Sequence, residues 1–226
     1  MFTPLAFTKE SIVTRGLVFH VDAADRTSYS PSNTVWNDLT SNNNDGTLTN
    51  GPTFDSGNGG NIIFDGSNDY ATIGYQLPAQ SSTTTFSWNL WIYLHSGNGN
   101  NDVIFGNRYS GNSGTQFTKI TPTNWEYYNS GGRNVSYSIP TNQWINLCVI
   151  KDQETHYYYS NGSQIGTKTS VTLSIGAMPV FMGADGYSGV SESSNVNFAF
   201  AAIYDRALSS TEVLQNYNAL KSRFNL

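Results

Sequence analysis

The chain has few charged side chains for its length of 226 residues. Asp, Glu, Lys and Arg together make up 12% of it, whereas about one quarter is usual in soluble domains. The formal net charge is -5, and the Lys and Arg residues are scattered rather than gathered in one segment. Because neutralising phosphate groups needs clustered cations, nucleic acid is not expected as a partner. The surface is expected to be polar and nearly uncharged.

Cysteine and histidine are scarce as well. Cys148 is the one cysteine in the sequence, which excludes an intrachain disulfide. It lies in the apolar stretch Trp144–Ile150 with no cation beside it, so a buried, inert thiol is expected rather than a nucleophile. The three histidines are isolated from one another, and no His-Glu-x-x-His or paired Cys/His spacing occurs. The common kinds of zinc site are therefore not expected.

Long hydrophobic runs are missing. No stretch reaches the length that a membrane span needs, so membrane insertion is not expected. The first ten residues, Met1–Glu10, contain neither a basic leader nor an apolar segment, which argues against a secretory signal. We expect the protein to be made in the cytoplasm and to stay there or leave by a route other than secretion.

The apolar residues that are present alternate along the chain, with a period of two. In Phe86–Leu94 every second residue from Phe86 is apolar, which predicts a half-buried strand with a second, partly aromatic face. Similar short runs recur along the chain, separated by Gly, Asn, Asp and Ser as turns require. They are Leu17–Val21, Asn61–Phe64, Tyr70–Ile73, Val103–Phe105, Gln116–Ile120, Trp125–Tyr128, Trp144–Ile150, His156–Tyr159, Val180–Met182 and Asn197–Tyr204.

Many short strands with little helix predict an all-β fold, a two-sheet antiparallel jelly-roll sandwich. Asn161-Gly162 follows three tyrosines and precedes another short run, which predicts a tight hairpin. We expect one sandwich domain over residues 16–226, since such folds reach this size as a single unit.

One helix is predicted at the C-terminal end of the sandwich. Ser209 and Glu212 have the spacing of a capping box, with Leu208 and Val213 placed as a hydrophobic staple. Apolar residues follow at helical spacing and form one stripe that is expected to lie across the sandwich. The stripe consists of Val213, Tyr217, Leu220 and Phe224.

The first fifteen residues differ from the rest. They show neither alternation nor a disordered composition, and they precede the segment where the sandwich pattern begins. Residues 1–15 are therefore predicted to form an N-terminal arm. The arm either packs on its own domain or reaches a neighbouring molecule.

Several segments match a known pattern in the same order along the chain. They are Gly16–Ala23 with Trp36–Leu39 and Asn44–Gly46, Ile63–Tyr70, Phe86–Leu94, Trp144–Leu147 followed by Tyr159–Gly162, and Ile203–Glu212. Together they resemble the laminin-G-like, concanavalin A-like jelly-roll domains, especially the pentraxin-related branch. The resemblance covers nearly everything from Gly16 onward. Its motifs are core aromatics and turn residues, which specify a fold better than a function.

Within this family the chain looks most like virion components of tailed bacteriophages. The resemblance implies a non-catalytic structural or adhesion module, either a capsid decoration or a tail appendage, located in the virion. Its expected partners are other capsid or tail proteins and a host-surface glycan. A homo-oligomer or a lattice environment is expected.

No catalytic motif accompanies the resemblance, so the chain is predicted not to be an enzyme. The paired carboxylates of retaining glucanases, on alternate strand positions, are missing, as is the Gly-x-Ser-x-Gly pattern of serine hydrolases. Two alternatives stay open. The chain could be a free-standing calcium-dependent carbohydrate-binding lectin, or a glycan hydrolase or lyase whose acidic residues converge from distant segments.

Calcium is the cofactor that the resemblance implies, because related domains bind it at one rim with oxygen ligands. Asn107 and Asp185 occupy the positions nearest to the metal-ligand loops of the family. The other interpretation, favoured by the abundance of Asn and Asp in turns, is that both are turn residues.

Glycan binding would need exposed aromatic rings with amides nearby. The candidate residues lie in or beside loops rich in Gly, Asn and Ser, and each of them could instead be a half-buried strand residue. They are Tyr109, Trp125, Tyr127, Tyr128 and Tyr187.

Overall fold

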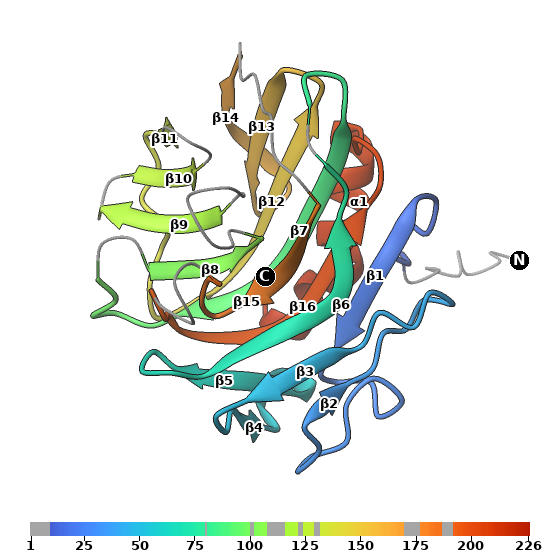
Figure 1. Cartoon of the computed structure of the whole chain (residues 1–226), viewed down its shortest axis with the longest axis vertical. Helices are drawn as coiled ribbons and strands as arrows, with labels where there is room; N and C mark the ends of the chain where they lie inside the picture. Colours follow the sequence, from blue (N-terminus) through green and yellow to red (C-terminus); the bar gives the residue numbers. More distant parts are fainter. Residues whose placement is uncertain are drawn as a thin grey trace, which may run out of the picture.

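The computed structural model of the chain describes most of its residues. They are residues 10–79, 81–99, 102–107, 116–121, 124–128, 132–169, 177–186 and 192–226. Within these ranges sixteen strands form two antiparallel sheets, with one α-helix at the C-terminal end. The predicted all-β sandwich is confirmed (Figure 1).

The first sheet is centred on two long strands, β7 (Thr85–Leu94) and β16 (Asn195–Tyr204). Its strand order is β14-β13-β12-β7-β16-β5-β4, and β1 also pairs with β16. The remaining bounds are β1 (Leu17–Asp22), β4 (Thr53–Asp55), β5 (Asn61–Asp65), β12 (Trp144–Asp152), β13 (Thr155–Ser160) and β14 (Ser163–Lys168).

The second sheet has the order β11-β10-β9-β8-β15-β6-β3-β2. Its strands are β2 (Val35–Trp36), β3 (Gly46–Thr49), β6 (Tyr70–Leu77), β8 (Asp102–Gly106), β9 (Gln116–Thr121), β10 (Asn124–Tyr128), β11 (Gly132–Val135) and β15 (Met178–Met182). Strands β2, β3, β4 and β11 were not predicted, because they are short and lie beside turn-rich sequence.

The main core lies between the two sheets. Phe86, Trp88, Leu90, Ile92 and Leu94 all point into it from β7, as the alternation predicts. The predicted hairpin is also confirmed, since Asn161 and Gly162 connect β13 to β14 with φ angles of 47° and 76°. Positive φ angles at both turn residues are what such two-residue hairpins require.

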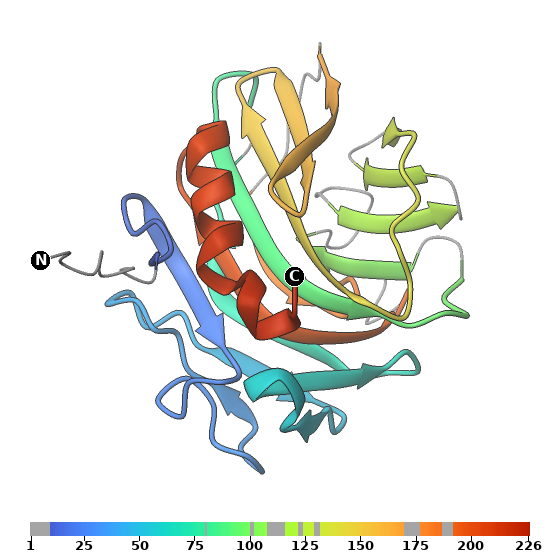
Figure 2. The same ribbon diagram turned by 180° about the vertical axis from the view of Figure 1, so that it is seen from behind.

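The opposite face of β7 is buried too, which the prediction of a half-buried strand missed. Helix α1 (Ser210–Lys221) lies across the outer face of the first sheet (Figure 2). The indole ring of Trp91 stacks on Tyr217, with ring centroids 5.6 Å apart, and on Phe224 at 4.3 Å. The molecule therefore has a second apolar layer between this sheet and the helix.

An irregularity in β16 serves both layers. Residues that are two positions apart on a regular strand face the same side. Phe198, however, lies in the core between the sheets, and Phe200 lies under the helix. The register of β16 against β7 shifts between these two phenylalanines. The inserted residue is the mark of a β-bulge, which lets one strand supply an aromatic ring to each layer.

The capping box of the helix is confirmed. The Ser209 hydroxyl accepts a hydrogen bond from the Glu212 backbone, while the Glu212 carboxylate accepts one from the Ser209 backbone. The same carboxylate forms a bidentate ion pair with Arg206, with N–O distances of 2.6 and 2.8 Å. Among the described helices, none combines the length and the apolar character that crossing a membrane would need.

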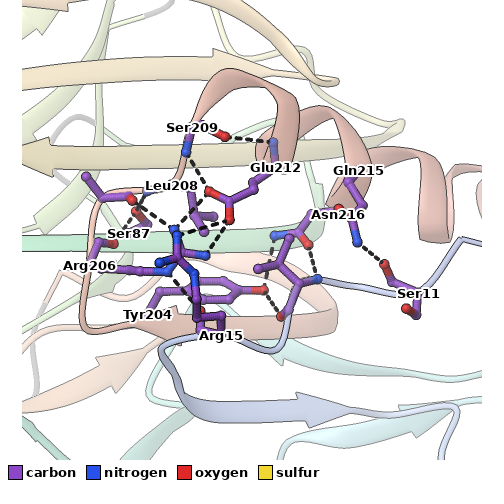
Figure 3. A network of polar contacts seen from close by, with 12 residues as sticks. Ser11, Arg15, Ser87, Tyr204, Arg206, Leu208, Ser209, Glu212, Gln215 and Asn216 are labelled. Atoms are coloured by element: carbon purple, nitrogen blue, oxygen red, sulfur yellow. Dashed lines mark hydrogen bonds and ion pairs between the residues drawn. The ribbon is translucent and has the colours of Figure 1, made fainter.

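Residues 10–15 of the predicted arm pack on their own domain. The Val13 amide donates to the Asn216 side-chain oxygen at 2.8 Å, and the Tyr204 hydroxyl donates to the Val13 carbonyl at 3.0 Å (Figure 3). Gln215 donates to the Ser11 carbonyl. Residues 10–15 therefore pack on their own domain, which is the first of the two predicted alternatives for the arm. Residues 1–9 lie outside the described residues.

Candidate functional site

A pocket of about 480 Å³ opens where two turn-rich segments meet. One segment follows β1 and leads into β2, and the other connects β3 to β4. We call it the Tyr29–Phe54 pocket. Its described lining consists of Tyr29, Pro31, Ser32, Asn33, Thr34, Leu48, Asn50, Gly51, Pro52, Thr53 and Phe54.

Two aromatic rings contribute to the apolar part of the lining. The rings of Tyr29 and Phe54 lie 5.6 Å apart at an angle of 32°. Tyr29 is almost fully buried, and its hydroxyl donates to the Asn33 carbonyl at 3.1 Å. Burial raises the pKa of Tyr29, so its hydroxyl is protonated and donates at neutral pH. Phe54 is only half buried and presents part of its ring to the pocket.

Neutral polar groups complete the lining. Asn50 donates its side-chain NH₂ to the Asn68 carbonyl at 2.8 Å. Its side-chain oxygen has no hydrogen-bond partner among the described residues, and the same holds for the side-chain amide of Asn33. These amides, together with hydroxyl groups of Ser and Thr, offer both donors and acceptors to a bound molecule.

The backbone at the pocket adopts an uncommon conformation. Ser32 and Asn50, one on each segment, have φ angles of 78° and 69°. Asn enters this left-handed region more readily than most residues do, but Ser does so rarely. Such conformations cluster at ligand sites because the surrounding structure must hold them in place.

The lining side chains are uncharged and include both hydrogen-bonding and apolar groups. None of the described lining residues is Asp, Glu, His, Lys, Arg or Cys. Among those lining residues, Tyr29 is the one side chain of a type used in acid–base chemistry, and the other polar side chains offer hydrogen bonds.

The family of the chain follows from its sequence profile. The profile of the concanavalin A-like lectin/glucanases superfamily, in its laminin-G-like branch, matches residues 65–214, about two thirds of the chain. The chain belongs to this superfamily. The family resemblance predicted from the ordered motifs is thus confirmed. No relative was found among curated protein sequences.

Solved structures share the fold of this superfamily member. A Trypanosoma rangeli sialidase in complex with 2,3-difluorosialic acid is 15% identical and covers 98% of the chain, with a TM-score of 0.72. The binding domain of Paraclostridial Mosquitocidal Protein 1 is 18% identical over 90%, with a TM-score of 0.65. The botulinum neurotoxin serotype D binding domain is 14% identical over 89%, with a TM-score of 0.68.

The chain spans only part of each of these proteins. It corresponds to 35% of the sialidase chain and to 52% and 51% of the two toxin domains. At such low identities the likeness establishes the fold alone. The superfamily contains both lectins and glucanases by its description, so membership by itself does not separate binding from catalysis.

The five aromatic residues predicted for glycan binding lie away from the pocket or outside the described part. Tyr109 and Tyr187 lie outside the described residues. Tyr127 and Tyr128 are on β10, and their side chains are not described. Trp125 is fully buried, and its ring packs edge-on against Tyr158 with centroids 5.4 Å apart. The expectation of an exposed ring is therefore wrong for Trp125, because the second sheet folds it into the core.

The two residues predicted to bind calcium follow the ends of two paired strands, β8 and β15. Asn107 and Asp185 are both fully buried. β8 and β15 are antiparallel, with Gly106 opposite Phe181, so Asn107 follows the end of β8 while Asp185 continues from β15 in the opposite direction. Within the described residues no group of three or more His, Cys, Asp or Glu could hold a metal ion. Calcium binding stays a prediction.

The thiol prediction is confirmed. Cys148 is fully buried on β12, and burial raises its pKa to about 12. A thiol with so high a pKa is protonated at neutral pH and is a poor nucleophile.

Sequence reasoning missed the Tyr29–Phe54 pocket. Its two segments, Ser30–Thr34 and Asn50–Thr53, each combine proline with Asn, Ser or Thr beside an aromatic residue. That composition is typical of turns, and neither segment was predicted to form a site. A search for aromatic residues directly beside such turns would have found Tyr29 and Phe54.

Proposed function

We propose that the chain is a non-catalytic carbohydrate-binding module that holds a sugar in the Tyr29–Phe54 pocket. The observation that carries the proposal is the pairing of half-buried Phe54 with the amides of Asn33 and Asn50 around one cavity. Sugar rings present apolar C–H faces and hydroxyl edges. Aromatic rings bind the faces, and amides bind the edges by hydrogen bonds.

The comparisons support a binding role. Two of the similar structures are described as binding domains, and the sialidase structure contains a sialic acid derivative. The superfamily description names lectins beside glucanases. A single module of this fold that binds glycan is consistent with the chain spanning about half of the toxin domains.

The non-catalytic part of the proposal rests on the pocket's chemistry. Glycosidases of the common kinds place two carboxyl groups at the scissile bond. The described lining of the Tyr29–Phe54 pocket contains no carboxyl group. Location in a virion, contact with capsid or tail proteins, and assembly into an oligomer or lattice stay predictions from the sequence, and the phage context has no support in the comparisons.

A glycan array probed with the purified chain tests the proposal. We expect binding to a defined group of glycans, retained when a calcium chelator is added, because no carboxylate lines the pocket. Phe54→Ala removes the half-buried ring and is expected to weaken binding about fivefold to tenfold. Leu214→Ala is the matched control, since Leu214 is 45% exposed on α1, away from the pocket.

Two results would contradict the proposal. One is the absence of binding to every glycan on the array. The other is equal binding by the Phe54→Ala and Leu214→Ala variants, which would place the glycan elsewhere on the molecule. Loss of binding on chelation would favour the calcium-dependent lectin that the sequence left open, with its site outside this pocket.

A further inference from the structure

The Tyr29–Phe54 pocket has a cation beside it. Arg26 is exposed, and its guanidinium carbon lies 5.3 Å from the centroid of the Phe54 ring. Because Arg26 lies against the Phe54 ring, an acidic substituent on a ligand that touches this ring can approach the guanidinium. Salt screens a charge–charge interaction less when the pair is partly buried than when both charges are in solvent.

The Arg26 guanidinium forms no hydrogen bond and no ion pair with any described residue. Two other arginines behave differently. Arg206 holds Glu212 through two nitrogen atoms. Arg223 is paired with Asp22 at 2.7 Å and also donates to the Asn58 and Gly60 carbonyls. Arg26 thus keeps its fork of N–H donors available for an incoming acceptor.

The nearest acidic side chains in the sequence are engaged elsewhere. Asp25 accepts from the backbone and the hydroxyl of Thr27 at 2.8 and 2.7 Å. Asp55, next to Phe54, accepts from Asn61 at 2.7 Å. Asp22 is paired with Arg223. No ion pair within 4 Å joins any of these carboxylates to Arg26 in the described part of the chain.

We propose that the pocket takes a sugar that carries a carboxylate, with Arg26 as the residue that recognises the acidic group. This inference rests on the proposed function and adds the class of ligand. The neutral lining binds the ring and hydroxyl groups of the sugar. The planar guanidinium binds the carboxylate through two parallel hydrogen bonds, a geometry that favours arginine over lysine.

Affinities for a matched pair of ligands test the inference. Methyl β-glucuronide and methyl β-glucoside differ by a carboxylate in place of a CH₂OH group, and isothermal titration at low salt measures both. The wild-type chain is expected to prefer the glucuronide by about fivefold, the size of an exposed ion pair. Arg26→Gln is expected to abolish the preference and leave the affinity for the glucoside unchanged. Arg26→Lys is expected to retain only part of it.

A second cation provides the control. The Lys221 ammonium group lies 5.4 Å from the centroid of the Tyr217 ring on α1. Lys221→Gln changes the net charge by the same amount as Arg26→Gln but leaves the pocket intact. We expect it to keep the preference for the glucuronide.

The outcomes separate the two proposals. Equal affinity of the wild type for both sugars, or an equal loss of preference in Arg26→Gln and Lys221→Gln, would overturn the assignment to Arg26 while the carbohydrate-binding function stands. If neither sugar binds and the glycan array is also blank, the proposed function fails and this inference fails with it.

Discussion

Two regions of the molecule combine aromatic rings with amide side chains, and they use them differently. Under α1 the ring of Trp91 lies against Tyr217 and Phe224, and both polar groups of the Asn216 side chain are hydrogen-bonded. In the Tyr29–Phe54 pocket the rings border a cavity, and the Asn33 side chain has no partner among the described residues. Where the contacts are complete they stabilise the fold, and where they are incomplete they are available to a ligand.

The largest expected loss of stability comes from the apolar layer under α1, where Trp91 packs against two other rings. Trp91→Ala would leave a cavity between β7 and α1, and it is expected to lower the free energy of unfolding by about 3–5 kcal/mol. Phe54→Ala removes a ring that already borders a cavity, and it is expected to cost roughly 1–2 kcal/mol. Urea denaturation of both variants measures the difference. Equal losses would mean that the two regions do not differ as described.

A smaller effect is expected from the amides. Asn216→Ala leaves the buried Val13 amide without its acceptor and removes the amide that donates to the Tyr204 hydroxyl, at a cost of about 1–3 kcal/mol. Asn33→Ala, in the pocket, removes an exposed side chain and is expected to change stability by less than about 0.5 kcal/mol. Thermal unfolding followed by circular dichroism compares them. A loss in Asn33→Ala as large as that in Asn216→Ala would contradict the distinction.

Removing residues 1–15 tests the contacts that the N-terminal arm makes with Tyr204 and Asn216. The truncation deletes Val13, which is buried under α1. The Tyr204 hydroxyl then loses its acceptor, and the Asn216 side-chain oxygen loses its donor. We expect a loss of about 1–3 kcal/mol in the free energy of unfolding. If the truncated chain were as stable as the whole chain, residues 10–15 would not belong to the folded unit.

The next expected effect is a loss of stability at acid pH. Hydrogen bonds from Arg206 hold the pKa of Glu212 at about 2, below its ordinary value of 4.5. A carboxyl group with a lowered folded-state pKa adds stability above its unfolded pKa and loses it as pH falls. The contribution is therefore complete above about pH 5 and disappears towards pH 2, with a size on the order of 1–2 kcal/mol.

Glu212→Gln measures that contribution. The variant is expected to be less stable at pH 7 and to differ little from the wild type near pH 2. Chemical denaturation at a series of pH values follows the difference. A difference that stays constant between pH 7 and pH 2 would show that the ion pair with Arg206 is not its source.

The sequence predicts the sandwich well because its long strands carry a clear alternation. Phe86–Leu94 and the capping box at Ser209 are local patterns, and the structure confirms both. It predicts burial less well where two elements meet. The second face of β7 is buried by a helix that lies more than a hundred residues away in the sequence. The residue pattern of Phe86–Leu94 alone does not indicate that contact.

The candidate site was harder to predict for the same reason. The pocket forms only when Pro31 and Pro52, on separate turns, are brought together by the pairing of β2 with β3. Trp125 shows the opposite error, because it was named as a candidate for sugar binding from its place beside polar turns, although the fold buries it completely. Turn composition indicates where the chain reverses, but it does not indicate which turns meet.

Chemical-shift mapping with a bound glycan tests the central claim most directly. Backbone amide signals of the ¹⁵N-labelled chain would be followed during titration with the best ligand from the array. The account predicts that the shifted signals cluster on Ser32–Thr34 and on Asn50 and Gly51, with those of α1 unchanged. Shifts centred on any other surface, with these amides unaffected, would contradict it.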